Sequence, residues 1–75
     1  MNKQRRKDIE KATALLEQAR EIIDTAQEEA QESYDNLPES IQESERGNAM
    51  YDNIDTLQTA SDNISDALDT LEEIE

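Results

Sequence analysis

The chain has 75 residues, of which 33% are hydrophobic and only two are aromatic, and it contains no cysteine and no histidine. With 20 acidic and 7 basic side chains, its formal net charge is -13. This composition excludes disulfides, thiolate chemistry and histidine-based metal or proton-transfer sites, and it disfavours a deep enclosed pocket. We therefore expect one small domain, residues 1–75, that has no enzyme activity and binds no metal or cofactor.

The charges are unevenly distributed along the chain. Residues 1–20 hold six of the seven cations and only three acids, whereas residues 21–75 hold 17 acids and the single cation Arg46. Such a surface repels nucleic acid and anionic membranes and attracts basic proteins. No apolar run reaches the roughly 20 residues that span a bilayer, and the basic start MNKQRRK precedes a charged segment, unlike a secretory signal peptide. We expect a soluble, cytoplasmic protein.

The first predicted element is a long amphipathic helix over about residues 3–33. Apolar side chains recur at intervals of three and four residues, which is the spacing of an a/d stripe in a coiled coil. The members of this stripe are Ile9, Ala12, Leu16, Ala19, Ile23, Ala26 and Ala30. Leu15 and Ile22 widen the stripe on one flank.

The connection covers about residues 34–44 and contains Pro38. Because a proline disfavours the helical conformation at the preceding residue, Pro38 predicts the end of the first helix. After it we expect one short helical turn, in which Leu37 and Ile41 fold back onto the ends of the long helices.

The second long helix is predicted over about residues 45–74. Ser44 is the favoured N-cap, and Asn48 is the competing one if Gly47 ends the short turn. The apolar stripe and its flanking positions are Met50, Ile54, Leu57, Ala60, Ser61, Ile64, Ala67, Leu68, Leu71 and Ile74. Two helices, each about 45 Å long, predict an all-α fold, namely an antiparallel, coiled-coil-like two-helix hairpin.

Charge and hydrophobicity extend this prediction. An antiparallel arrangement sets the basic residues Arg5 to Lys7 beside the acidic residues Glu72 to Glu75, where exposed ion pairs would each contribute under about 1 kcal/mol. The apolar stripe is wider than one partner helix can cover. We therefore expect two copies to form a four-helix bundle; the alternatives are a monomer capped by the short turn and a monomer that docks another protein.

The acidic residues from position 51 to 71 are all aspartates, although glutamate is the better helix former by about half a kcal/mol per site. They are Asp52, Asp55, Asp62, Asp66 and Asp69, and in the heptad frame they occupy only positions b and f. Their usual axial spacing of about 5 Å is comparable to that of phosphates along a nucleic-acid strand. A short side chain also places its charge more rigidly than glutamate does.

Two interpretations of this aspartate stripe compete. A charged outer face is what any soluble amphipathic helix shows. However, the second helix has no lysine partners for its acids, and a helix selected only for stability would carry mixed charges. We therefore predict that the aspartates bind a basic partner protein, with a second patch formed by Glu28, Glu29, Glu32 and Asp35.

A resemblance adds to this reading. The segment YDNLPESIQESERGNAM, residues 34–50, lies between two acidic helical arms. In this segment, and over nearly the whole chain, the sequence resembles small acidic, mostly uncharacterised proteins of bacteriophages and prophages. The resemblance implies expression in a bacterial cytoplasm and carries no established activity or site residues. In architecture and charge the chain is also similar, by class, to phage DNA mimics that block restriction enzymes or CRISPR nucleases.

The leading hypothesis is therefore a phage counter-defence protein that occupies the basic nucleic-acid channel of a host nuclease or CRISPR complex and does not bind nucleic acid itself. The alternative is a non-mimetic interaction module, for example a phage assembly or regulatory adaptor, that uses Leu15, Ile22, Ile74 and the loop 37–50. Strongly salt-sensitive binding favours the mimic. Salt-tolerant binding with a negative heat-capacity change favours the module.

Overall fold

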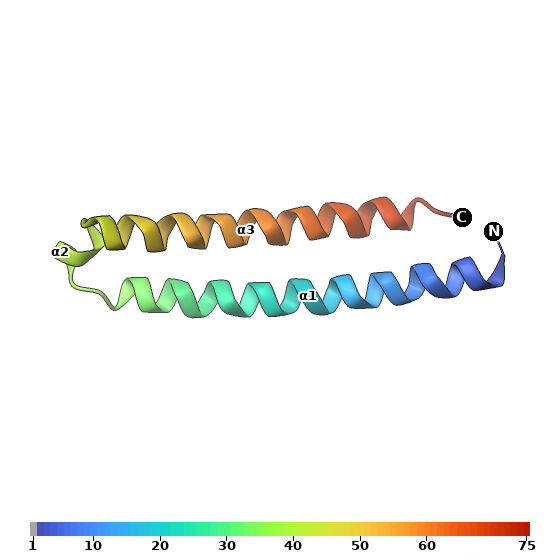
Figure 1. Ribbon diagram of the computed structural model, residues 1–75, viewed down its shortest axis with the longest axis horizontal. Coiled ribbons are helices and arrows are strands. Elements are labelled where there is room, and N and C mark those ends of the chain that lie inside the picture. The colour runs from blue at the N-terminus through green and yellow to red at the C-terminus, as the bar shows by residue number, and fades with distance from the viewer. Residues whose placement is uncertain (1) are drawn as a thin grey trace.

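A computed structural model describes residues 2–75 and shows an all-α architecture, as predicted. Three helices, α1 (Lys3–Asp35), α2 (Glu39–Gln42) and α3 (Glu45–Glu72), follow one another along the chain. The long helices α1 and α3 lie side by side and run in opposite directions, so the two termini meet at one end and α2 lies at the other (Figure 1). The result is a rod with extents of 58 × 15 × 12 Å.

The ends of the long helices have local causes. Asn2 caps α1, because its side-chain oxygen accepts a 2.8 Å hydrogen bond from the N–H of Arg5. The helix ends at Asp35, two residues beyond the expected position, and the N–H of Asn36 closes its last turn. Pro38 is the N-cap residue of α2, so it starts the short helix after α1 has already ended. Helix α3 ends at Glu72, two residues before the expected end.

The N-cap of α3 is Ser44, which confirms the favoured of the two predicted caps. Its hydroxyl oxygen accepts a 3.3 Å hydrogen bond from the N–H of Gly47. The competing residue, Asn48, lies inside the helix, where its N–H donates to the carbonyl of Ser44. Gly47 is buried against α2, and a Cβ atom at this position would overlap the backbone oxygens of Ile41 and Gln42.

Replacing Ser44 by alanine is expected to lower the free energy of unfolding by about 1 kcal/mol, because the N–H of Gly47 loses its side-chain partner. Urea unfolding followed by circular dichroism measures this change. The matched control is Ser40→Ala, which removes an exposed hydroxyl in α2 and should change the stability by a few tenths of a kcal/mol at most. Equal effects of the two substitutions would contradict the assignment of the cap.

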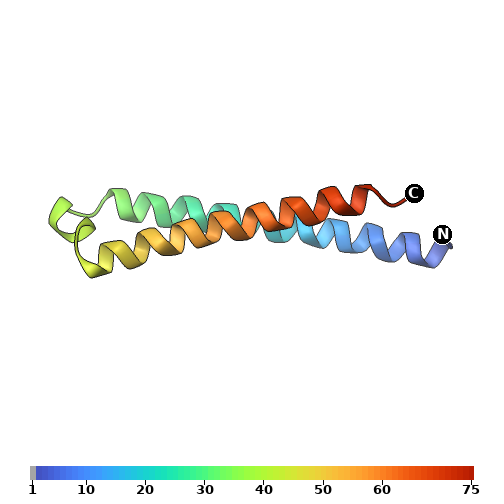
Figure 2. The same ribbon diagram turned by 90° about the horizontal axis from the view of Figure 1, so that it is seen from above.

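Burial is strongly unequal between the two long helices. In α3 the buried residues recur every seven positions, at Gly47, Ile54, Ser61 and Leu68, whereas α1 has no buried residue. The helices cross at a shallow angle (Figure 2), so the part of this seam from Ile54 to Leu68 remains in contact with α1, whereas Gly47 packs on α2. One side of α3 is therefore fully covered, and α1 is only partly covered.

The face of α1 that packs on α3 is rotated slightly from the predicted one: Ile9, Leu16, Ile23 and Ala30 are half-buried as predicted. Ala12 and Ala26, which were predicted for the seam, are exposed. The half-buried stripe that replaces them also has intervals of three and four residues and consists of Ile9, Thr13, Leu16, Arg20, Ile23, Gln27, Ala30 and Tyr34. The prediction was wrong at Ala12 and Ala26 because it selected apolar residues throughout, whereas the structure turns three polar residues, Thr13, Arg20 and Gln27, toward α3 together with the apolar ones.

Polar contacts accompany the apolar ones across the seam. Ser61, which is 5% exposed, donates a 2.6 Å hydrogen bond to the carboxylate of Asp24. Gln27 likewise donates to Gln58 at 2.8 Å. A buried polar group costs free energy unless it finds a hydrogen-bond partner. Asp24 therefore compensates the burial of the Ser61 hydroxyl, whereas the hydrogen bond between Gln27 and Gln58 is exposed and has no such cost to offset.

Candidate functional site

The candidate site is the acidic surface of α3, where all five predicted aspartates are exposed. Asp55, Asp62 and Asp69 each follow a seam residue by one position, which places them about 100° around the helix from the seam. Asp52 and Asp66 precede a seam residue by two positions and lie farther around, on the outer side. The aspartates thus cover a band from one edge of the helix pair to the back of α3.

Local hydrogen bonds leave most of these carboxylates available to a partner. The hydroxyl groups of Thr56, Thr59 and Thr70 donate to main-chain carbonyl oxygens four residues earlier, those of Asp52, Asp55 and Asp66 respectively. These bonds do not use the aspartate side chains. Of the five carboxylates, that of Asp62 accepts a 3.0 Å hydrogen bond from Gln58.

A second row of acids on α1, which sequence reasoning missed, lies beside this band. Glu10, Glu17 and Asp24 are spaced by seven residues and therefore share one edge of α1. The hydrogen bond between Asp24 and Ser61 sets that edge next to the one that carries Asp62. The seven-residue spacing could have indicated the row, but its position beside α3 depends on which face of α1 packs.

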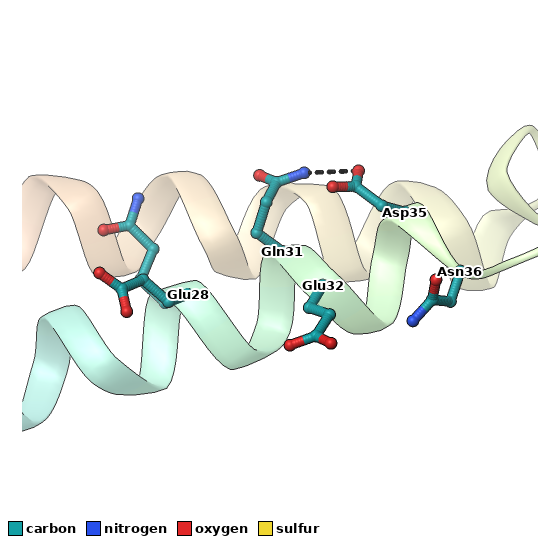
Figure 3. Close-up of a pocket in the computed structure, with 6 residues that line it drawn as sticks. Glu28, Gln31, Glu32, Asp35 and Asn36 are labelled. Atoms are coloured by element: carbon teal, nitrogen blue, oxygen red, sulfur yellow. Dashed lines mark hydrogen bonds between the residues drawn. The ribbon is translucent and has the colours of Figure 1, made fainter.

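The predicted second patch is divided by the structure. Glu28, Glu32 and Asp35 line one open hollow at the end of α1 that lies near α2, whereas Glu29 lines a different hollow. Figure 3 shows the first of these, in which the amide of Gln31 donates a 2.9 Å hydrogen bond to Asp35 while the carboxylate of Glu32 points the other way. Glu28, Glu32 and Asp35 therefore lie together, and Glu29 lies apart from them.

A small hollow lies between the two ends of the chain. Arg6 lines this hollow together with Glu10 and Glu75, so the basic and acidic ends of the chain lie close together. The ion pairs expected there stay a prediction.

Among residues 2–75, no group of three or more acidic side chains is arranged to hold a metal ion. Within the same residues, each helix is too short or too polar to cross a membrane.

Comparison with protein-family models, with curated proteins and with solved structures finds no match to this chain.

Proposed function

We propose that this chain is a phage counter-defence protein that acts as an acidic nucleic-acid mimic in the bacterial cytoplasm. Its partner would be a basic host protein, such as a nuclease or CRISPR effector, whose DNA- or RNA-binding channel the rod would occupy. Arginine and lysine side chains in that channel would bind aspartate carboxylates in place of phosphates. The rod has neither a scissile phosphodiester bond nor base edges, so it would block the channel without being cleaved.

The observation that carries this proposal is the uncompensated row of exposed aspartates on one rigid helix. Helix α3 runs without interruption from Glu45 to Glu72, and its only cation is Arg46 in the first turn. The carboxylates therefore keep a fixed spacing along the rod, and the neighbouring acids Glu10, Glu17 and Asp24 add to the same field. A groove lined by cations attracts such a surface over a distance that shrinks as salt rises.

A capture experiment from bacterial lysate tests the proposal. The immobilised protein is incubated with lysate at about 50 mM and at about 300 mM salt, and the bound proteins are identified by mass spectrometry. We expect nucleases or other nucleic-acid-binding proteins at low salt and their loss at high salt, because electrostatic contacts with a phosphate-like array are screened. Recovery of the same nucleic-acid-binding proteins at both salt concentrations would argue against mimicry, as would recovery of virion components alone.

The alternative function, a helical interaction module, is favoured by a different observation. Leu15 and Ile22 are 56% and 69% exposed, so an apolar surface is available to another protein. The two functions separate in calorimetry, because burial of this surface gives a negative heat-capacity change and tolerates salt. The expected four-helix bundle would use the same apolar surface, because two copies of the chain could each cover the surface of the other.

A further inference from the structure

One flank of α1, about 100° around the helix from the residues that pack on α3, carries a regular apolar stripe, of which only Ala19 is half-buried. Its members are Ala12, Leu15, Ala19, Ile22 and Ala26, at intervals of three and four residues. Leu15 and Ile22 are more than half exposed, and Ala12 and Ala26 are exposed as well. In this stripe alanine alternates with a larger aliphatic residue, a pattern that lets two helices approach closely while the large side chains interlock.

The total exposed surface of this elongated chain leaves room for an interface. The chain exposes 5869 Å², whereas a folded monomer of 8.6 kDa is expected to expose about 4,700 Å². A stable interface buries about 800 Å² on each partner. Covering the stripe with another helix would remove much of this excess, and a second copy of the chain supplies a helix with the matching pattern.

The charges at the two ends of α1 select the orientation of that second copy. Residues 1–11 hold five cations and two acids, whereas residues 28–35 hold four acids and no cation. A parallel pair of α1 helices would bring the acidic ends together and the basic ends together, which costs free energy. An antiparallel pair sets each basic end against the acidic end of the other copy.

A hollow on the surface of α1 sets the register. It is lined by Glu21, Ile22, Thr25, Ala26 and Glu29. Four of these residues are related as i, i+3, i+4 and i+7, which is the arrangement of a hole that receives one knob from a facing helix. The second copy has a knob of the right kind in Leu15, which is large, apolar and exposed.

We propose that two copies of the chain form a two-fold symmetric dimer through antiparallel α1 helices, with Leu15 of each copy seated in the hollow beside Ala26 of the other. This inference deepens the proposed self-association and does not depend on nucleic-acid mimicry. In the same register Ile22 faces Ala19 of the second copy, so that each large side chain meets a small one. Lys11 comes close to the level of Glu32 of the second copy, and both side chains are exposed.

Single-cysteine variants test this register, because the chain has no cysteine of its own. Leu15→Cys and Ala26→Cys are purified separately, mixed, and oxidised with oxidised glutathione. We expect a disulfide-linked dimer in the mixture, since the proposed register would bring the two Cα atoms within the roughly 4.4 to 6.8 Å that a disulfide requires. Each variant alone should stay uncrosslinked, because its two copies of the thiol would lie about 16 Å apart along the antiparallel helices.

A matched control uses Ala14→Cys mixed with Ala26→Cys. Ala14 is an exposed alanine next to Leu15 but about 100° around the helix, so this mixture should not crosslink. Crosslinking of Leu15→Cys alone would indicate a parallel pair and overturn the proposal. A chain that crosslinks in no mixture would overturn it too, whether sedimentation equilibrium finds a monomer or a dimer formed through another surface.

The effect of salt concentration on binding distinguishes the dimer from the complex with a basic partner. Each chain carries a formal charge of -13, so added salt screens the repulsion between two copies and should strengthen the dimer several-fold. Binding to a basic partner should weaken under the same change. The double variant Leu15→Gln/Ile22→Gln should raise the dissociation constant of the dimer at least tenfold and leave the helical content unchanged, because neither side chain is buried against α3.

Discussion

Replacing Asp55, Asp62, Asp66 and Asp69 together by asparagine is expected to abolish binding to the basic partner while the helix pair remains folded. Each charge-assisted hydrogen bond that is lost contributes about 1.5 to 3 kcal/mol, so four losses total about 6 to 12 kcal/mol. This total is comparable to the whole binding free energy of a micromolar complex, about 8 kcal/mol. The side chains are exposed, and asparagine has nearly the same size, so no packing is disturbed.

The stability of this variant should change in the opposite direction. Removing four charges from a face that repels itself should raise the free energy of unfolding slightly at low salt, although asparagine is no better as a helix former. Circular dichroism establishes that the helices are intact, and isothermal titration at two salt concentrations measures the binding to a nuclease captured from the lysate. A folded variant that binds as tightly as the parent would show that the aspartates form only a solvated face.

The matched control removes the same number of charges at other positions. Asp8, Glu39, Glu43 and Glu75 are exposed and lie outside the aspartate band; the aspartate is replaced by asparagine and the three glutamates by glutamine. This variant has the same net charge as the asparagine variant, so long-range attraction falls equally in both. We expect a modest loss of association rate in the control and a loss of the complex only in the asparagine variant.

Replacing Gly47 by alanine is expected to destabilise the fold, although alanine is the better helix former by about 1 kcal/mol. Gly47 has no positive φ, so its role is to allow close approach and not to provide an unusual backbone conformation. The added Cβ would overlap the backbone oxygens of Ile41 and Gln42, and backbone atoms cannot move aside as a flexible side chain can. Overpacking of this kind costs about 1 to 3 kcal/mol.

Thermal unfolding followed by circular dichroism measures this effect. At equal protein concentration, a net loss of about 1 to 2 kcal/mol should lower the Tm by about 5 to 15 °C. The control is Asn48→Ala, one residue further along the same turn, where the side chain is exposed and helix propensity should raise the stability slightly. If Gly47→Ala is as stable as the control, α2 can shift without cost and the glycine does not determine the connection.

Periodicity and capping rules predicted most of the elements. Long runs of apolar residues at intervals of three and four predict helices whatever their neighbours are, and both long helices lie within two residues of the expected limits. Ser44 was identifiable because capping is a local interaction between a side chain and the N–H groups of the next turn. The aspartates could be placed away from the seam of α3 because that seam, from Ile54 to Leu68, is unambiguous in the sequence.

The sequence by itself thus determined the helical class, the helix limits, the cap and the charge distribution, all of which depend on neighbouring residues along the chain. Only the tertiary structure decided which stripe of α1 faces α3, because α1 carries two stripes with the same intervals. One contains Leu15 and Ile22, and the other contains Arg20 and Gln27. The second packs on α3, where its members Leu16 and Ile23 are half-buried and Arg20 and Gln27 donate hydrogen bonds to Ser65 and Gln58 at 3.2 and 2.8 Å, and a helix cannot turn both stripes to one neighbour.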